Sequence, residues 1–155
     1  MTEENPSARR RNPNRDRSNA RRLAMQAIYQ HLLGDDNWKA LRVQFHEDPE
    51  FARVDPEYFD ELLQNGVERK EELLAMLAPH FDRPAEQIDP VELAILLIGG
   101  FELRGRLDIP YRVVINEGVE LAKRFGAADG HRYVNAILDR AAAELRTLET
   151  ASRRR

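Results

Sequence analysis

The sequence predicts an all-α fold built as a single domain. Apolar residues recur at spacings of three and four in one stretch after another, which is the period of a helix buried on one face. No stretch keeps the apolar–polar alternation of a half-buried strand. Two Asp-Pro pairs, Asp55-Pro56 and Asp89-Pro90, stand where helices are expected to begin. With 155 residues, the chain has the size of one domain with its own hydrophobic core.

The first helix is expected to follow a flexible, arginine-rich N-terminal arm. Residues 1–17 mix prolines and asparagines with arginines, and this mixture breaks both helical and strand periodicity. From Ser18, which we interpret as the N-cap, an apolar stripe follows one helical face as far as Gly34. The stripe consists of Leu23, Ala24, Ala27, Ile28 and Leu32.

Two amphipathic segments are predicted next. The first is irregular and covers about residues 37–51, with Trp38, Leu41 and Phe45 as apolar members. The second is a long helix capped by Asp55, with Pro56 at the first helical position, where the missing N–H costs nothing. It is expected to end at Pro79, and its apolar face consists of Phe59, Leu62, Leu63, Val67, Leu73, Leu74 and Leu77.

The helix that begins at Asp89-Pro90 is predicted to be central. Glu92 lies three residues after the cap, as in a capping box. Residues 91–103 are apolar on almost every side, so neighbouring helices must cover all faces. Gly99-Gly100 costs helix propensity, roughly 1 kcal/mol per glycine. This predicts that another backbone approaches closely there.

Two more helices complete the predicted domain. Pro110 is expected to start the first of them, and Gly126 to end it in the left-handed conformation. Asp129 is expected to cap the last helix, whose apolar stripe reaches Leu148. The helical domain is therefore assigned to residues 18–149, with a basic tail over residues 150–155.

The residues that carry catalysis and metal binding are missing or badly placed. There is no cysteine, the serines lie near the ends of the chain, and no histidine has a second ligand at metal-binding spacing. A glycine-rich phosphate loop is also missing. Glu117 and Glu120 could share a face, but Lys123 and Arg124 follow them and favour a solvated ion-pair surface. We expect neither an enzyme nor a bound cofactor or metal.

The basic charge is concentrated at the N-terminus. Residues 1–22 hold seven basic and three acidic residues, whereas the remaining 133 hold 17 basic and 24 acidic residues. Arginines suit both phosphate contact and stacking on unpaired bases, so RNA is the expected ligand. A solvated tail that only aids solubility is the alternative. The candidate RNA-binding arginines are Arg9, Arg10, Arg11, Arg15, Arg17, Arg21 and Arg22.

A second candidate RNA surface precedes the last helix, over residues 123–133. It combines basic side chains, the backbone N–H groups of a helix N-terminus, and the ring of Tyr133. The alternative is structural: Asp129 caps the helix and Tyr133 packs against the core. Spacing alone does not choose between these two interpretations.

Four blocks of the sequence resemble the NusB family of bacterial transcription antitermination factors. The first is ARRLAMQAIYQ at residues 20–30, and the second is DPVELAIL at residues 89–96, followed by FEL at 101–103. The third is IPYRVVINEGVELAKRFG at residues 109–126, and the fourth is DGHRYVNAILD at residues 129–139. The resemblance covers about residues 17–145 and is most specific over 108–139.

The resemblance implies two packed helical bundles and a role without catalysis. Members of the family pair with NusE, which is ribosomal protein S ten, and the pair binds the single-stranded boxA element of nascent RNA. This lets RNA polymerase read through terminators in ribosomal RNA operons. Carried over to this chain, the RNA contacts fall on Arg17 and Arg21 and on Asp129, Arg132 and Tyr133. The NusE contact falls on the central helix, at Glu92.

Two other functions compete with this one. The chain could be an RNA-recognition module that assists the processing or methylation of ribosomal RNA, or an interaction bundle without RNA affinity. The longest apolar run, Leu93–Phe101, is too short to span a bilayer, and no secretory signal is recognised. We therefore expect a cytoplasmic protein that makes no membrane contact.

Overall fold

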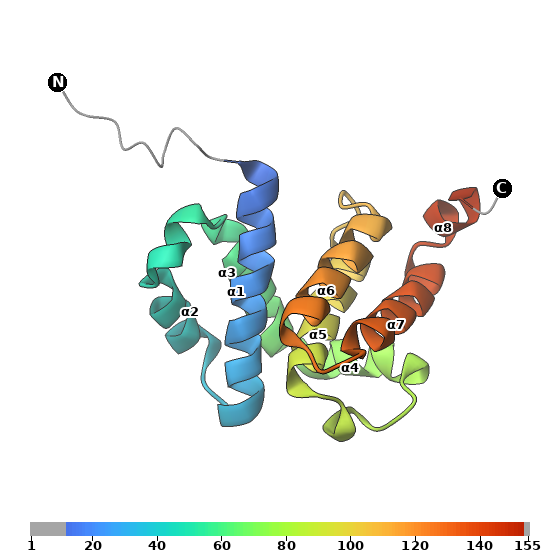
Figure 1. The fold of residues 1–155 in the computed structure, drawn as a ribbon, viewed down its shortest axis with the longest axis horizontal. Coiled ribbons are helices and arrows are strands. Elements are labelled where there is room, and N and C mark those ends of the chain that lie inside the picture. The colour runs from blue at the N-terminus through green and yellow to red at the C-terminus, as the bar shows by residue number, and fades with distance from the viewer. Residues whose placement is uncertain (1–11, 154–155) are drawn as a thin grey trace.

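The computed structural model describes residues 12–153, which form two groups of helices packed side by side (Figure 1). The first group comprises α1 (Pro13–Gly34), α2 (Trp38–His46), the 3-10 turn η2 (Pro49–Arg53) and α3 (Pro56–Glu68). The second comprises α4 (Lys70–Leu77), the 3-10 turns η3 (Ala78–His80) and η4 (Ala85–Gln87), α5 (Pro90–Gly105), α6 (Tyr111–Phe125), α7 (Gly130–Leu145) and α8 (Thr147–Arg153). The described residues contain no strand, and the predicted all-α fold of two packed bundles is confirmed.

The central position predicted for the helix after Asp89-Pro90 is also confirmed. Every residue of α5 from Glu92 to Leu103 is buried, because α1, α3, α4, α6 and α7 all pack against this helix. The expectation that another backbone approaches Gly99 and Gly100 closely is wrong, because side chains of neighbouring helices pack there instead. A Cβ on Gly99 would lie 2.7 Å from a methyl group of Leu138 on α7, and one on Gly100 would lie 3.1 Å from Leu77 on α4.

The first helix begins six residues earlier than predicted, with its N-cap at Asn12 instead of Ser18. The side chain of Asn12 accepts a hydrogen bond from the backbone N–H of Arg15 at 3.1 Å, and Pro13 takes the first helical position. Asn12 is therefore the N-cap, and Ser18 lies one and a half turns inside the helix. Residues 13–17, which we assigned to the flexible arm, are helical because of this cap. Residues 1–11, with Arg9, Arg10 and Arg11, lie outside the described residues, as do residues 154–155.

Two helices predicted to be continuous are each broken in two. The segment from Pro56 to Pro79 breaks at Arg69, which separates α3 from α4 and lets Leu73 and Leu77 reach the core beside α5. The last helix breaks at Arg146, which leaves helical geometry and turns its side chain into the protein. Gly126 is extended, with φ −82° and ψ 175°, so the expected left-handed end of α6 is wrong.

Candidate nucleic-acid interface

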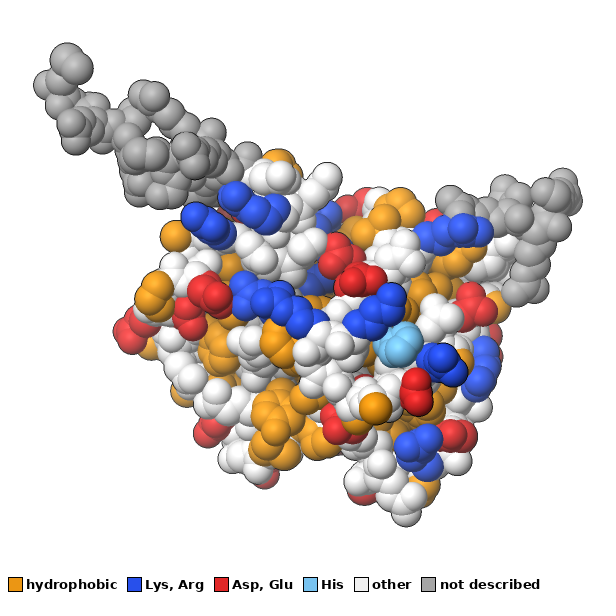
Figure 2. All heavy atoms as spheres, in the orientation of Figure 1, with side chains coloured by type: hydrophobic (Ala, Val, Ile, Leu, Met, Phe, Trp, Pro, Cys, Tyr) orange, Lys and Arg blue, Asp and Glu red, His pale blue; other side chains and the backbone are white. Residues whose placement is uncertain are grey.

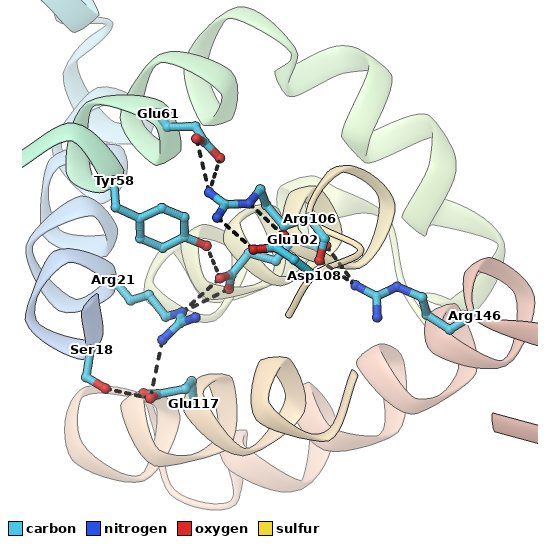
Figure 3. A network of polar contacts seen from close by, with 9 residues as sticks. All are labelled: Ser18, Arg21, Tyr58, Glu61, Glu102, Arg106, Asp108, Glu117 and Arg146. Carbon is cyan, nitrogen blue, oxygen red and sulfur yellow. Dashed lines mark hydrogen bonds and ion pairs between the residues drawn. The ribbon is translucent and has the colours of Figure 1, made fainter. Parts of the chain in front are cut away.

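Arg21 lies inside the protein rather than on an RNA-binding surface. Its Nε–H donates to both oxygens of the Glu102 carboxylate, at 2.9 and 3.1 Å, and its Nη1 lies 3.3 Å from Glu117 (Figure 3). The Arg21 side chain is only 3% exposed. The sequence places Arg21 among the RNA-binding arginines, whereas the structure places its side chain in the interior. The side chain instead joins α1 to α5 and α6.

Tyr58 on α3 completes this buried cluster. Its hydroxyl donates to Glu102, and its ring lies beneath the guanidinium groups of Arg17 and Arg106, at 4.7 and 4.9 Å from the ring centroid. Burial raises the pKa of Tyr58, and the negative charge of Glu102 raises it further. The phenol therefore stays protonated and remains a donor. Arg17 thus rests on the folded domain.

A second polar cluster fixes the end of α5 and the loop that leads to α6. The buried guanidinium of Arg146 donates to the backbone carbonyls of Leu103 at 2.7 Å and of Arg106 and Ile109 at 2.9 Å. It also donates to Glu149, whose carboxylate accepts the N–H of Tyr111, the first residue of α6, at 3.0 Å. The last C=O groups of a helix and the first N–H groups have no partner within it. Arg146 and Glu149 supply these partners.

The other described arginines of α1 lie closer to the surface. Arg15 pairs with the neighbouring Asp16 at 3.0 Å, and Arg22 pairs with Glu50 of η2 at 2.9 Å. The Arg22 side chain is half-buried, and Glu50 is exposed. The assignment of Arg15, Arg17 and Arg22 to RNA binding stays a prediction.

The start of α7 is capped differently from the prediction. Asp129 adopts the left-handed conformation, with φ 63°, and its exposed side chain makes no capping hydrogen bond. The carboxylate of Glu92 lies at this helix terminus instead, so close that a Cβ on Gly130 would be 2.6 Å from Oε1. A helix N-terminus favours a negative charge. Gly130 thus leaves room for an acid that comes from α5.

Glu92 and Tyr133 line a cavity of about 430 Å³, together with Arg83, Asp89, Asp129 and neighbouring residues. Glu92 is only 6% exposed, and its assignment to the NusE contact stays a prediction. Burial raises the pKa of Glu92, and the nearby charge of Asp89 raises it further. Tyr133 is half-buried, and the guanidinium of Arg83 lies 4.8 Å from its ring centroid. Arg132 is exposed beside them.

Sequence reasoning missed Glu102, Tyr58 and Arg146, although one of them carries a signal. Glu102 is an acid inside an otherwise apolar helix, and a buried carboxylate requires a charged or hydrogen-bonding partner. Nothing in the sequence indicates that this partner is Arg21, which lies 81 positions away. The sequence pattern does not indicate the role of Arg146 either, because most of its partners are backbone carbonyls.

Among the residues that the structure describes, no group of three or more His, Cys, Asp or Glu side chains is placed to hold a metal ion. None of the helices between residues 12 and 153 has the length and apolar character needed to cross a membrane.

Comparison with known proteins decides the family. A model of the NusB family matches residues 18–143 of the chain. The chain belongs to the NusB family. The match includes all four blocks that resemble this family and the second candidate RNA surface; it begins after the arm, so Arg21 and Arg22 are the candidate arginines of the first surface that lie within it. The recognition made from the sequence is confirmed.

Named relatives in the NusB family agree in function and fold. The transcription antitermination protein NusB of Marinobacter nauticus is 48% identical over 139 residues, covering 89% of this chain and 87% of its own. The protein of the same name from Teredinibacter turnerae is 48% identical over 134 residues, covering 86% and 91%. A solved structure of T. maritima NusB superposes with a TM-score of 0.73 at 24% identity, covering 86% of this chain and 93% of that one. The chain is a transcription antitermination factor of this family.

Proposed function

We propose that this protein, paired with NusE, binds the single-stranded boxA element of nascent RNA and so promotes read-through by RNA polymerase in ribosomal RNA operons. The observation that carries the proposal is the gathering of basic side chains on one face of the domain. Figure 2 shows lysine and arginine side chains over α1 and again across the molecule on the side of α6 and α7, with a histidine among them and acidic side chains between the two groups. Such a face attracts a polyanion.

The RNA contacts are assigned to two groups of residues. The N-terminal group comprises Arg9, Arg10, Arg11, Arg15, Arg17 and Arg22; Arg21 is left out because it is an internal residue. The second group comprises Asp129, Arg132 and Tyr133. The guanidinium of Arg132 is suited to bidentate contact with a phosphate. The ring of Tyr133 offers a surface on which a base stacks, once Arg83 moves aside or joins the stack.

The NusE contact is assigned to the opening of the cavity above Glu92. Three carboxylates, those of Asp89, Glu92 and Asp129, line this cavity. Residues 23–155 carry 17 basic and 24 acidic residues, so the body of the protein complements a basic ribosomal protein. RNA and NusE would then meet at neighbouring sites around the start of α7.

We propose a binding role without catalysis, exercised in the cytoplasm where bacterial transcription takes place. The support is the antitermination name of the relatives and the sequence, which has no cysteine and no serine or histidine arrangement suited to nucleophilic catalysis.

Titration of labelled single-stranded boxA RNA, with and without NusE and at several salt concentrations, tests the proposal. The full chain should bind with an affinity that falls steeply with salt, by about 0.7 log units per log unit of salt for each phosphate neutralised. NusE should tighten binding to boxA more than to a scrambled sequence. A chain lacking residues 1–11 should show a flatter slope. This deletion stops before the Asn12 cap, whereas a deletion to residue 22 would also remove the Arg21–Glu102 pair.

RNA binding that does not depend on salt, or that fails to distinguish boxA from the scrambled sequence when NusE is present, would defeat the proposal. Replacing Arg132 by Gln offers a second arm of the same test, because this side chain is exposed and its removal leaves the fold intact.

A further inference from the structure

A groove separates the two groups of residues assigned to RNA. It has a volume of about 360 Å³ and lies between α1 and the second half of α6. From α1 it is lined by Ser18, Asn19 and Arg22, and from α6 by Glu117, Glu120, Leu121, Lys123 and Arg124. Two segments that lie about a hundred positions apart in the sequence thus form one surface, which sequence periodicity does not reveal.

The acidic side chains of the groove do not cancel its positive charge. Glu117 accepts a hydrogen bond from the Ser18 hydroxyl at 2.5 Å and lies 3.3 Å from Arg21, so the interior of the protein already compensates its charge. Glu120 is 71% exposed and pairs with Lys123 at only 3.5 Å. Exposed pairs of this kind are weak, and a phosphate group readily replaces the carboxylate.

Two of the three cations of the groove are directly available. Lys123 is 53% exposed, and Arg124 is exposed and lies 4.9 Å from the ring centroid of Phe125. Arg124 has no carboxylate partner among the described residues. The third, Arg22, is held by the exposed Glu50, again through a surface pair. The groove therefore presents several cationic hydrogen-bond donors that favour binding of the phosphate groups of RNA.

The lining also indicates which part of a nucleotide fits. No aromatic side chain lines the groove in the part of the chain that the structure describes, so no platform for base stacking exists there. Ser18 and Asn19 also line the groove, but the Ser18 hydroxyl donates to Glu117 and the Asn19 amide donates to the carbonyl of Arg53, so the donors offered to RNA are those of the cations. Charged donors without a stacking surface suit the sugar–phosphate backbone rather than the bases.

We infer that this groove holds the sugar–phosphate backbone of the RNA, with Lys123 and Arg124 as further phosphate-binding residues. The inference rests on the proposed RNA binding and deepens it. One strand runs from the arginines of α1, through the groove, to Arg132 and Tyr133 at the start of α7. The groove adds affinity independently of base sequence, and base selection is left to the ends of this path.

Removing the two α6 charges tests the inference. The double variant Lys123→Gln/Arg124→Gln should lower the magnitude of the log–log salt slope by about 1.4, which corresponds to two phosphates on single-stranded RNA. The loss should be the same for boxA and for a scrambled RNA of equal length. A matched control, Lys39→Gln/Arg69→Gln, removes two exposed charges on α2 and at the α3–α4 junction and should leave the slope unchanged.

A variant that is expected to bind RNA more tightly is the control for general damage to the protein. Glu120→Gln removes the exposed acid that competes for Lys123 and should tighten RNA binding by about two- to fivefold at low salt. An unchanged slope in the α6 double variant, while the parent protein binds RNA normally, overturns the inference and leaves the proposed function standing. So does a loss confined to boxA, which indicates base contact. If the parent protein shows no salt-dependent RNA binding, the proposed function itself fails.

Discussion

Arg21 and Glu102 form a buried ion pair, with Arg21 Nε 2.9 Å from Glu102 Oε2 and side-chain exposures of 3% and 1%. The pair links the first helical bundle to the second, because Arg21 belongs to α1 and Glu102 to α5. Burial lowers the pKa of Arg21, but the negative charge of Glu102 and its other acidic neighbours outweighs burial and raises it. Arg21 therefore stays charged, and the position of α1 depends on it.

Replacing Arg21 by Met should destabilise the protein by about 3–5 kcal/mol, because it leaves the Glu102 carboxylate buried without its charged partner. Urea denaturation followed by circular dichroism measures this change in the free energy of unfolding. The control is Arg22→Met, which breaks only the surface pair with Glu50 and should cost about 0–1 kcal/mol. Similar losses in the two variants would show that the buried pair adds nothing to stability.

Replacing Arg146 by Met should destabilise the protein by about 3 kcal/mol or more, since the buried carbonyls of Leu103 and Ile109 lose this donor at once and each unsatisfied group costs about 1–3 kcal/mol. Amide exchange should accelerate first around Tyr111, whose N–H depends on Glu149. Arg140→Met is the matched control, because Arg140 donates to one carbonyl, that of His80, at an exposed site. Uniform acceleration across all helices would contradict a local role for Arg146.

Adding a methyl group at Gly130 should displace the Glu92 carboxylate, because a Cβ there would lie 2.6 Å from Oε1. We expect Gly130→Ala to cost about 1–3 kcal/mol, as overpacking does. The same substitution should cost much less in a Glu92→Ala background, where the obstructing carboxylate is missing. A double-mutant cycle measured by thermal unfolding gives this coupling. Additive effects would mean that the strain lies elsewhere.

The stability gained by Glu92→Gln should depend on pH. The pKa of Glu92 is raised in the folded protein, so between its usual value near 4.5 and the raised value the folded state binds more protons than the unfolded state. The free energy of unfolding of the parent therefore falls as pH rises through that window. Gln does not titrate, so the variant should gain stability relative to the parent as pH rises above 4.5, and urea denaturation at a series of pH values measures the difference. A constant difference across the series would rule out the buried charge as its cause.

Replacing Tyr133 by Leu should weaken the binding of boxA RNA by about 1–3 kcal/mol, because a stacking surface is lost. Tyr133→Phe keeps the ring and should bind within a factor of two of the parent. Fluorescence anisotropy at fixed salt, with NusE present, compares the two variants. If Phe and Leu weaken binding equally, the hydroxyl rather than the ring makes the contact.

The sequence predicts the helices well where burial follows a period, and poorly where backbone geometry decides. Apolar residues on almost every side of α5 identified it as the central helix. The two Asp-Pro pairs marked the starts of α3 and α5. The breaks at Arg69 and Arg146 were missed because apolar residues keep helical spacing across both. Asp129 is a residue type favoured at N-caps, but its backbone is left-handed and its side chain makes no capping hydrogen bond. The carboxylate of Glu92, which is distant in the sequence, lies at this helix terminus instead.

For the candidate site, composition located the basic regions but did not show which cations are internal. Arg21 and Arg22 are neighbours in the sequence, yet one faces the core and the other faces Glu50. A helix turns by about 100° per residue, so adjacent side chains point in different directions. Whether a given arginine meets RNA or a buried carboxylate depends on a partner far along the chain, and one sequence alone does not reveal that pairing.

The position of Arg146 has a consequence for biosynthesis. The ribosome makes this residue 43 positions after Leu103, whose carbonyl it binds, and well after α6 has been completed. Until it emerges, the carbonyls of Leu103 and Ile109 and the N–H of Tyr111 lack the partners that Arg146 and Glu149 give them. The nascent polypeptide thus reaches its mature arrangement in a late step, in which a single guanidinium closes the second bundle.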